Sequence, residues 1–340
     1  MSNSSPMKTR AQIAALTVAI VAFATIGTMS AAGWVDRTFP GFLVLDNGVV
    51  ASVGLPGWPA TSDGEIFQRR ITHIDGAAVD WDADVLHHVG SQAEGTPVVI
   101  GLRSGAGAMD LEVSVERFAF RDVLLIFGAY LVNGLLLGGV ALLALSRSRS
   151  HEGVRAAIPF LVCASFWGLT GMGLYSGHLA LFRLHALFET FLFAAALHLA
   201  LEFPSALIRP SRSRQIVAAG YAAAIALALA YQVLLFEPAS YVRVHLLTTS
   251  LGGAALLAVV AGLVFRYVRS QRHELHATLR VLTAGACLAL LLPVALTLPE
   301  IVTGGSAPQN LVAWTVFVFP LTIGYAIGRD GAIGARPTVR

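Results

Sequence analysis

Long apolar runs separated by short polar segments cover most of the chain. Each run approaches the roughly 20 residues that an α-helix needs to cross the hydrocarbon core of a bilayer. Short polar turns near 177–181 and 237–242 predict that the third and fourth runs, and the fifth and sixth, form antiparallel hairpins. The pattern predicts about eight transmembrane helices, at residues 11–33, 123–145, 157–177, 181–203, 215–236, 244–265, 278–298 and 310–328.

Residues 34–122 follow a different pattern. Apolar and polar residues alternate strictly over 111–115, which is typical of a strand with one buried face. Runs rich in Val and Ile at 48–53, 70–74 and 97–103 are bounded by turn residues and predict further strands. The spacing of Val85, Leu86 and Val89 predicts a short helix over 82–90. These elements together indicate a small α+β domain.

The predicted fold is therefore a mostly α membrane protein with an α+β domain between its first and second transmembrane helices. Its predicted parts are an N-terminal anchor (1–33), the α+β domain (34–122), a seven-helix bundle (123–328) and a tail (329–340). The first run also fits a signal peptide with a small-residue cleavage site at 30–32, but its length favours a retained anchor.

Composition supports a membrane protein. Hydrophobic residues make up 56% of the chain and charged residues 13%, whereas soluble domains are about 25% charged. A single large soluble fold, a disordered chain and a nucleic-acid-binding protein are excluded on this ground. Residues 34–122 hold 13 acidic residues against 6 arginines, and the rest holds 17 Lys and Arg against 7 acidic residues. This unequal distribution of charge predicts an acidic, water-facing domain and basic residues in the loops and termini that flank the helices of the bundle.

The placement of Lys and Arg predicts the orientation, because basic flanks of membrane helices stay in the cytoplasm. With the N-terminus inside, only Arg183 and Arg243 fall in the short loops of the opposite side. Both termini are then cytoplasmic and residues 34–122 are extracytoplasmic. The basic residues on the cytoplasmic side are Lys8, Arg10, Arg147, Arg149, Arg155, Arg209, Arg212, Arg214, Arg266, Arg269, Arg272, Arg280, Arg329, Arg336 and Arg340.

Ionisable side chains within the fourth apolar run are the main candidates for a buried polar site. His185 and Glu189 share one helix face, as do His198 and Glu202, because each pair is four residues apart. Glu189 and His198 lie on nearly opposite faces and cannot share a metal ion on this helix alone. The four residues form either a proton-sensitive polar site or, more commonly, hydrogen bonds that fix helix packing. Candidate partners on neighbouring helices are Tyr130, Asn133 and Trp167.

Three stretches of the α+β domain carry a family resemblance: Ile71-Thr72-His73-Ile74-Asp75-Gly76-Ala77-Ala78-Val79, Gly95-Thr96-Pro97-Val98-Val99 and Arg103-Ser104-Gly105. This order resembles a PDZ-like domain of the bacterial type. The resemblance implies a peptide added to a sheet edge, with its carboxylate held by a backbone loop. The nearest counterpart of that loop is Gly41, Phe42, Leu43 and Val44. Asp75-Gly76 alone is also simply a good hairpin turn.

Two further stretches lie at the ends of predicted helices: His198 to Glu202 followed by Phe203-Pro204, and Phe319-Pro320 followed by Tyr325-Ala326-Ile327. With the anchor and the PDZ-like domain, they make the chain similar to the N-terminal membrane sensor region of competence-type bacterial sensor histidine kinases. The resemblance implies a sensor in the bacterial cytoplasmic (inner) membrane. Because the chain stops at Arg340, we expect no kinase domain here.

These observations predict a non-catalytic, receptor-like membrane protein that relays a signal to a partner in trans. The alternative is a structural or accessory subunit of a larger membrane complex. Expected partners are membrane lipids and a cytoplasmic signalling protein or complex subunits, with an extracytoplasmic peptide as a further candidate and no nucleic acid. We expect no catalytic residue, cofactor or metal site, since His273 and His276 lack the four-residue spacing that a shared metal needs on a helix.

Overall fold

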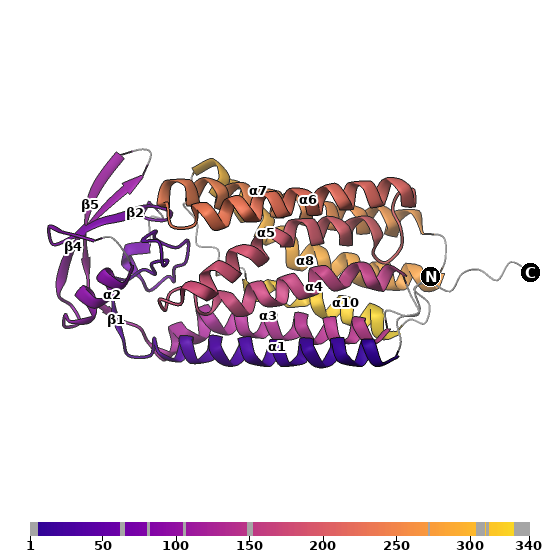
Figure 1. Cartoon of the computed structure of the whole chain (residues 1–340), viewed down its shortest axis with the longest axis horizontal. Coiled ribbons are helices and arrows are strands. Elements are labelled where there is room, and N and C mark those ends of the chain that lie inside the picture. The colour runs from indigo at the N-terminus through magenta and orange to yellow at the C-terminus, as the bar shows by residue number, and fades with distance from the viewer. Residues whose placement is uncertain are drawn as a thin grey trace, which may run out of the picture.

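A computed structural model describes residues 6–61, 65–79, 82–104, 107–147, 152–270, 273–303, 310 and 313–329. Long helices lie side by side as a bundle, and a small domain containing strands sits at one end (Figure 1). The first helix begins, and the last ends, at the opposite end of the bundle (Figure 1). The start of α1 and the end of α10 therefore lie at the end of the bundle that is opposite to the small domain.

Seven helices in the described part of the chain are long and apolar enough to cross a membrane, which confirms a mostly α membrane protein. Their lengths follow from uninterrupted apolar runs bounded by Pro, Gly or charged residues. They are α1 (Pro6–Ala32), α3 (Phe120–Arg147), α4 (Glu152–Gly171), α5 (Leu179–Glu202), α6 (Pro210–Leu234), α7 (Pro238–Arg269) and α8 (His273–Thr303).

The eighth predicted helix, at 310–328, is not a continuous transmembrane helix. The structure has a four-residue helix α9 (Ala313–Val316), a break at Phe317, and α10 (Val318–Arg329). The 12 residues of α10 rise about 18 Å, which is short of the ~30 Å hydrocarbon core. Pro320 lies in the first turn of α10, where its missing N–H has no intrahelical partner to lose. The prediction of eight full-length helices is therefore wrong.

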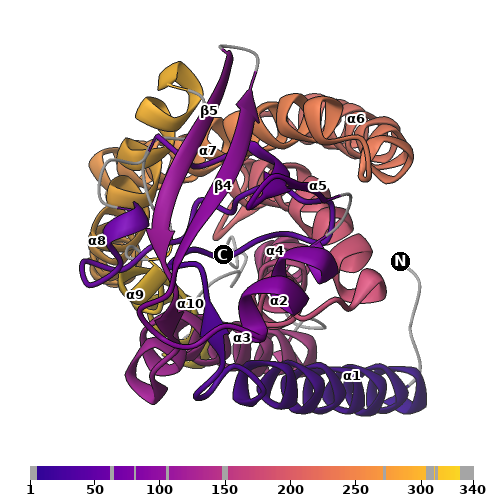
Figure 2. The ribbon, with the colours of Figure 1, turned by 90° about the vertical axis from the view of Figure 1, so that its left-hand side faces the viewer.

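The helices pack in a ring-like order. Neighbouring pairs are α3 with α4, α4 with α5, α5 with α7, and α7 with α8, and α10 lies against both α8 and α3. Figure 2, viewed from the domain, shows α1 and α6 at the periphery. Small residues allow close approach: Ser165 Oγ on α4 donates to the carbonyl of Gly134 on α3 at 2.6 Å. A cavity lies at the centre of this ring.

The domain contains a four-stranded antiparallel sheet in the order β3-β2-β4-β5. The helix predicted at 82–90 is confirmed as α2. The sheet strands are β2 (Arg70–Ile74), β3 (Ala77–Ala78), β4 (Pro97–Ser104) and β5 (Gly107–Ser114); the other elements are β1 (Thr38–Phe39), which pairs with β6 (Glu116–Arg117), α2 (Asp82–Gly90) and a 3-10 turn (Pro59–Thr61).

The strand predicted at 48–53 does not form as a ladder. Val50 pairs with Val44 and Val49 pairs with Arg70, each through a single bridge. The segment therefore divides its backbone hydrogen bonds between two different neighbours, and neither pairing extends along the chain. Its apolar side chains are nevertheless buried, as a run rich in Val would suggest even without a strand.

The turn between β2 and β3 is formed by Asp75 and Gly76, as predicted. Both have positive φ angles, 49° and 80°, which a two-residue hairpin turn of the primed type requires. The Asp75 carboxylate accepts a hydrogen bond from the Val99 N–H at 2.9 Å and lies 3.0 Å from His88 Nε2. These two contacts, the Val99 N–H first, hold the pKa of Asp75 below its ordinary value of 3.8.

Asp75 therefore gives the domain a small dependence on pH. Because the folded pKa is depressed, its stabilisation is present above about pH 4 and is lost as the pH falls through the folded value. The side chain is 42% exposed, so we expect the loss to be under about 1 kcal/mol. Unfolding of wild type and Asp75→Asn at pH 5 and pH 3 measures it, since Asn keeps the turn. An equal loss in both proteins would contradict this assignment.

The domain is seated firmly on the bundle. Trp34, Phe39, Trp58 and Phe118 form an aromatic cluster that continues into the bundle through Phe127, whose ring lies 6.2 Å from that of Phe118. Two buried side-chain amides add specific ties. Asn47 Nδ2 donates to the carbonyl of Leu235, the residue after α6, at 2.8 Å. The side-chain amide of Asn310, which precedes α9 in the chain, makes two hydrogen bonds with the backbone of Gly54 in the domain. Domain and bundle thus share one continuous core.

Candidate functional site

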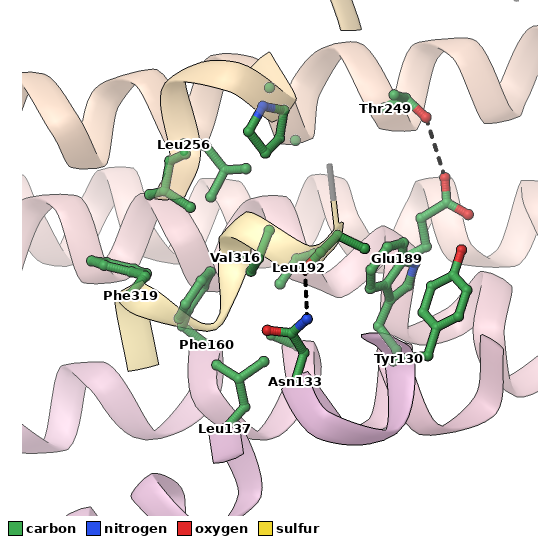
Figure 3. Close-up of a pocket in the computed structure, with 18 of the residues that line it drawn as sticks. Tyr130, Asn133, Leu137, Phe160, Glu189, Leu192, Thr249, Leu256, Val316 and Phe319 are labelled. Atoms are coloured by element: carbon green, nitrogen blue, oxygen red, sulfur yellow. Dashed lines mark hydrogen bonds between the residues drawn. The ribbon is translucent and has the colours of Figure 1, made fainter. Parts of the chain in front are cut away.

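A cavity of about 240 Å³ lies inside the bundle, between α3, α4, α5, α7, α8 and the α9–α10 segment. Side chains that are distant in the sequence converge on it (Figure 3). Most of its wall is apolar, and the hydrocarbon side chains and rings that line it include Leu137, Phe160, Leu192, Leu256, Val316 and Phe319. A cavity of this size and lining has room for a small apolar molecule.

One part of the wall carries a carboxyl–imidazole pair. Glu189 Oε1 on α5 lies 2.9 Å from His245 Nδ1 on α7, and the two side chains are only 11% and 19% exposed. Tyr231 on α6 donates to Glu189 Oε2 at 3.4 Å, and Thr249 donates to Oε1 at 3.5 Å, as Figure 3 shows for Thr249. A carboxyl group so deep in a membrane bundle needs these partners, because burying it alone is costly.

His185 also faces the cavity but contacts a different helix. Its Nδ1 lies 3.0 Å from the carbonyl oxygen of Trp167 and 3.3 Å from Thr170 Oγ1, both on α4. Because a carbonyl only accepts, Nδ1 carries a hydrogen. The prediction that His185 and Glu189 share one helix face is confirmed, since both line the same cavity. The structure binds them to different neighbours, α4 and α7, rather than to one another.

His198 and Glu202 form a separate cluster away from the cavity. Their side chains are 3.4 Å apart, as the four-residue spacing predicts, and Ser213 Oγ on α6 donates to Glu202 Oε1 at 2.7 Å. This cluster links the ends of α5 and α6. The four candidate residues thus belong to two sites, and the part of the chain that the structure describes holds no group of three metal-ligating side chains.

His245 and Tyr231 are members of the site that sequence reasoning missed. His245 stands at the edge of the run predicted at 244–265, where a polar residue is ordinary and attracts no notice. A usable signal was present: Tyr241, His245 and Thr249 repeat every four residues, so they form a polar stripe on an otherwise apolar helix. Tyr241 stacks on His245, with ring centroids 5.6 Å apart.

The segment proposed as a PDZ-like groove, Gly41 to Val44, is buried. Phe42, Leu43 and Val44 are each at most 1% exposed and belong to the hydrophobic cores. Gly41 has a φ of 76°, and the carbonyl of Leu43 accepts from the Ala51 N–H at 2.9 Å. A peptide could therefore reach this loop only after these contacts opened.

Phe203 and Pro204 form the turn that follows α5. Phe203 is buried, and its N–H donates to the Leu199 carbonyl, which ends the helix. Arg266, from α7, donates to three carbonyls around this turn: Ala200 at 2.9 Å, Leu201 at 3.1 Å and Ser205 at 3.0 Å. This turn therefore has a clear packing role.

The second pair of motif residues lies on α10. Pro320 lines the cavity beside Phe319, whose ring packs edge-on against Phe160 with centroids 5.9 Å apart. Tyr325 is 41% exposed, and its hydroxyl accepts a hydrogen bond from the guanidinium of Arg329, one turn later. One motif residue thus faces the cavity and the other faces outward.

No protein-family model, no curated protein and no solved structure matches this chain. The PDZ-like and sensor-region resemblances therefore stay predictions, and the function is argued from geometry.

Proposed function

We propose that this protein is a non-catalytic, multi-pass receptor of the bacterial inner membrane, with residues 34–122 outside and both termini in the cytoplasm. It would relay a change in the outer domain or the cavity to a cytoplasmic partner in trans. The observation that supports this proposal is the placement of Asn310 and of residues 313–329. Asn310 contacts the outer domain, residues 313–320 include four that line the cavity, and α10 ends at the far side of the bundle.

The contact with the domain is made by Asn310. Its Nδ2 donates to the Gly54 carbonyl at 3.1 Å, and its Oδ1 accepts from the Gly54 N–H at 3.0 Å. Asn310 is only 2% exposed, so water competes little for these bonds. A shift of the Gly54 backbone therefore moves Asn310 or breaks two hydrogen bonds.

The next part of the segment is held by α3. Asn133 Nδ2 donates to the Ala313 carbonyl at 2.7 Å, and Trp314 Nε1 donates to the Leu125 carbonyl at 3.0 Å. Val316, Phe319 and Pro320 then line the cavity. A molecule in the cavity would contact α9 and α10, and the outer domain is linked to the residues just before them through Asn310. Two sites can be coupled when both contact the same movable element.

The break at Phe317 fits this role. A helix interrupted once can shift its two parts relative to each other, whereas a continuous helix moves as a rod. Beyond the break, α10 runs between α3 and α8 to Arg329, among the basic residues that favour a cytoplasmic location. Tyr325 and Arg329 are exposed there and would be available to a partner.

We expect Asn310→Ala to uncouple the domain from α9 and α10. Loss of two hydrogen bonds of about 1 kcal/mol each predicts destabilisation by about 2 kcal/mol. To read the relay, a photo-crosslinking amino acid at position 325 reports contact with a partner in native membranes. We expect one discrete protein adduct, with a yield that Asn310→Ala changes about fivefold, the effect of a coupling free energy near 1 kcal/mol.

Asn47→Ala is the matched control, because the Asn47 side chain also links the domain to the bundle, through its hydrogen bond to the Leu235 carbonyl rather than to Asn310 or residues 313–329. It should leave the adduct at position 325 unchanged. An adduct of constant yield in all variants, at fixed stoichiometry with other membrane proteins, would favour a structural subunit instead. Crosslinking to lipid alone would refute the relay.

A further inference from the structure

The outer edge of the sheet in the domain carries a groove that the proposed relay does not use. Among the described strands, β5 pairs only with β4, so its other edge has no neighbouring strand (Figure 2). A hollow of about 300 Å³ lies beside it and is lined by residues 60, 65–66, 109, 111–114 and 116. We call this hollow the β5 groove.

The β5 groove follows the backbone of the strand and does not cover one face alone. Side chains of consecutive strand residues point to opposite faces of a sheet. Residues 111–114 are consecutive, and all four line the groove. The groove therefore runs along the free edge of β5, where the residues of both faces meet. This is the position that a further strand would occupy.

The free edge presents backbone groups that β4 does not use. In an antiparallel pair, residues that bond the partner strand alternate with residues whose N–H and C=O point away from it. The Val115 N–H donates to the Thr96 carbonyl at 2.9 Å, so the alternation directs the backbone groups of Ser114 and Glu112 outward. Ser114 lies opposite Pro97, which has no N–H, as this assignment requires. Ser114 and Glu112 are both exposed, and such an edge is a template for another extended chain.

The charge around the β5 groove is negative. Glu65, Glu112 and Glu116 line it, and none of them forms an ion pair with a basic side chain in the described part of the chain. Burial, together with the nearby carboxylates of Asp122 and Glu94, raises the pKa of Glu116 above its ordinary value of 4.5. A basic group entering the groove would offset this concentration of negative charge, whereas an acidic group would increase it.

The rest of the groove lining is apolar. Met109 and Leu111 on β5 are only half-buried, although their side chains pack against the core of the domain. A segment that alternates apolar and basic residues would therefore match both parts of the lining. A second copy of this chain fits less well, because pairing two β5 edges would place Asp110 and Glu112 of both copies close together, and like charges on paired strands are destabilising.

We propose that the β5 groove binds an extended, basic segment of another protein, which adds to the sheet as a strand beside β5. Main-chain hydrogen bonds to Glu112 and Ser114 would hold the segment, and its Lys or Arg side chains would pair with the carboxylates of the groove. This inference goes beyond the relay through residues 313–329, because it concerns what the domain binds. Only the extracytoplasmic location of the partner rests on the proposed function.

The test uses the full chain in phosphatidylcholine nanodiscs, which have no net lipid charge and leave both sides of the protein accessible. The probe is a fluorescent peptide of alternating lysine and valine with blocked ends and the eight-residue length of β5. We expect saturable binding, measured by fluorescence anisotropy. A peptide with the same residues in two blocks should bind about tenfold more weakly, because it cannot match the alternating faces of a strand. Equal binding of the two peptides, or no binding of the alternating one, would overturn the proposal.

N-methylated peptides test the main-chain bonds without any change in the protein. In an extended alternating peptide, the lysine N–H groups point to one edge and the valine N–H groups to the other, so methylating one set blocks one edge. Strand addition predicts that one of the two analogues loses binding about tenfold and that the other stays within about twofold of the parent peptide. Equal losses in both analogues, or a loss in neither, would contradict it.

Glu112→Lys tests the charge of the groove. Glu112 is exposed, so the substitution should leave the fold intact. We expect about tenfold weaker binding of the lysine–valine peptide and stronger binding of a glutamate–valine peptide. Glu237→Lys is the matched control, because Glu237 is also exposed and makes the same change in charge outside the groove, before α7. It should bind both peptides as the wild type does, and equal effects of the two variants would reduce the interaction to net charge.

Two further results would assign the groove to another occupant and overturn the proposal. Self-association of the full chain that Glu112→Lys abolishes would identify a second copy. Displacement of the peptide by calcium chloride, but not by sodium chloride at equal ionic strength, would identify a divalent cation. Neither the peptides nor these variants alter Asn310, so a failure here leaves the crosslinking test of the relay standing and the two proposals are judged separately.

Discussion

Replacing His245 with phenylalanine is expected to destabilise the protein by about 3 kcal/mol, the lower end of the range for removing one partner of a buried ionic pair. Phenylalanine supplies an aromatic ring that can still stack on Tyr241 but removes the nitrogen 2.9 Å from Glu189. Glu189 is then left in the bundle with only the longer contacts from Tyr231 and Thr249. Equilibrium unfolding in mixed micelles of SDS and a mild detergent measures the loss.

The double variant Glu189→Gln/His245→Phe is the control for this prediction. If the loss comes from an unpaired carboxyl, neutralising Glu189 should restore much of the stability, because an amide in the same place carries no charge to bury. His245→Phe unfolding at the same SDS concentration as the wild type would contradict the assigned pair. A double variant as unstable as the single one would show that His245 acts through packing alone.

The second large effect is expected at Arg266. Arg266→Leu keeps most of the side-chain volume but leaves the carbonyls of Ala200, Leu201 and Ser205 without their donor. Hydrogen bonds to charged groups contribute about 1.5–3 kcal/mol each, and they do not add fully. We expect the unfolding free energy to fall by about 3–4 kcal/mol, with lost protection from hydrogen exchange at the end of α5.

Arg269→Leu provides the matched control three residues later. Arg269 is exposed, and its guanidinium lies over the Phe265 ring at 4.9 Å, a contact worth about 0.5–1 kcal/mol at a surface. Its loss should therefore change stability by under about 1 kcal/mol. If the two variants lose similar amounts of unfolding free energy, Arg266 acts only as one of the cytoplasmic basic residues and does not support the turn after α5.

Arg266 illustrates what the chain alone could not reveal. By its place in the sequence, Arg266 is one of the basic residues at the cytoplasmic ends of the helices. The rule that basic residues stay in the cytoplasm considers only their position and does not distinguish a buried arginine from an exposed one. In the structure it is 8% exposed and turned inward, onto a turn that lies about 60 residues earlier in the chain. Position along a helix fixes the depth of a side chain, but the neighbouring helix decides whether a long side chain points to water or to the interior.

The local structure of the α+β domain was easier to predict from the sequence. The residues that alternate, 111–115, correspond to the second half of β5 and the residue after it, and Asp75-Gly76 makes the expected turn. Both were predictable because period-two burial and positive φ depend only on neighbouring residues. The run at 48–53 was misleading because burial alone produces apolar residues whether or not a ladder forms.

The sequence by itself located seven long helices, though not their exact limits, and placed the domain between the first two. Run length against bilayer thickness and the change of period are properties of consecutive residues. Only the tertiary structure decided the broken eighth helix, the pairing of Glu189 with His245, and the ties of Asn133 to Ala313 and Gly54 to Asn310, which are 180 and 256 residues apart. In a lipid environment many helix arrangements bury equally apolar faces, so hydrogen bonds and close packing select among them.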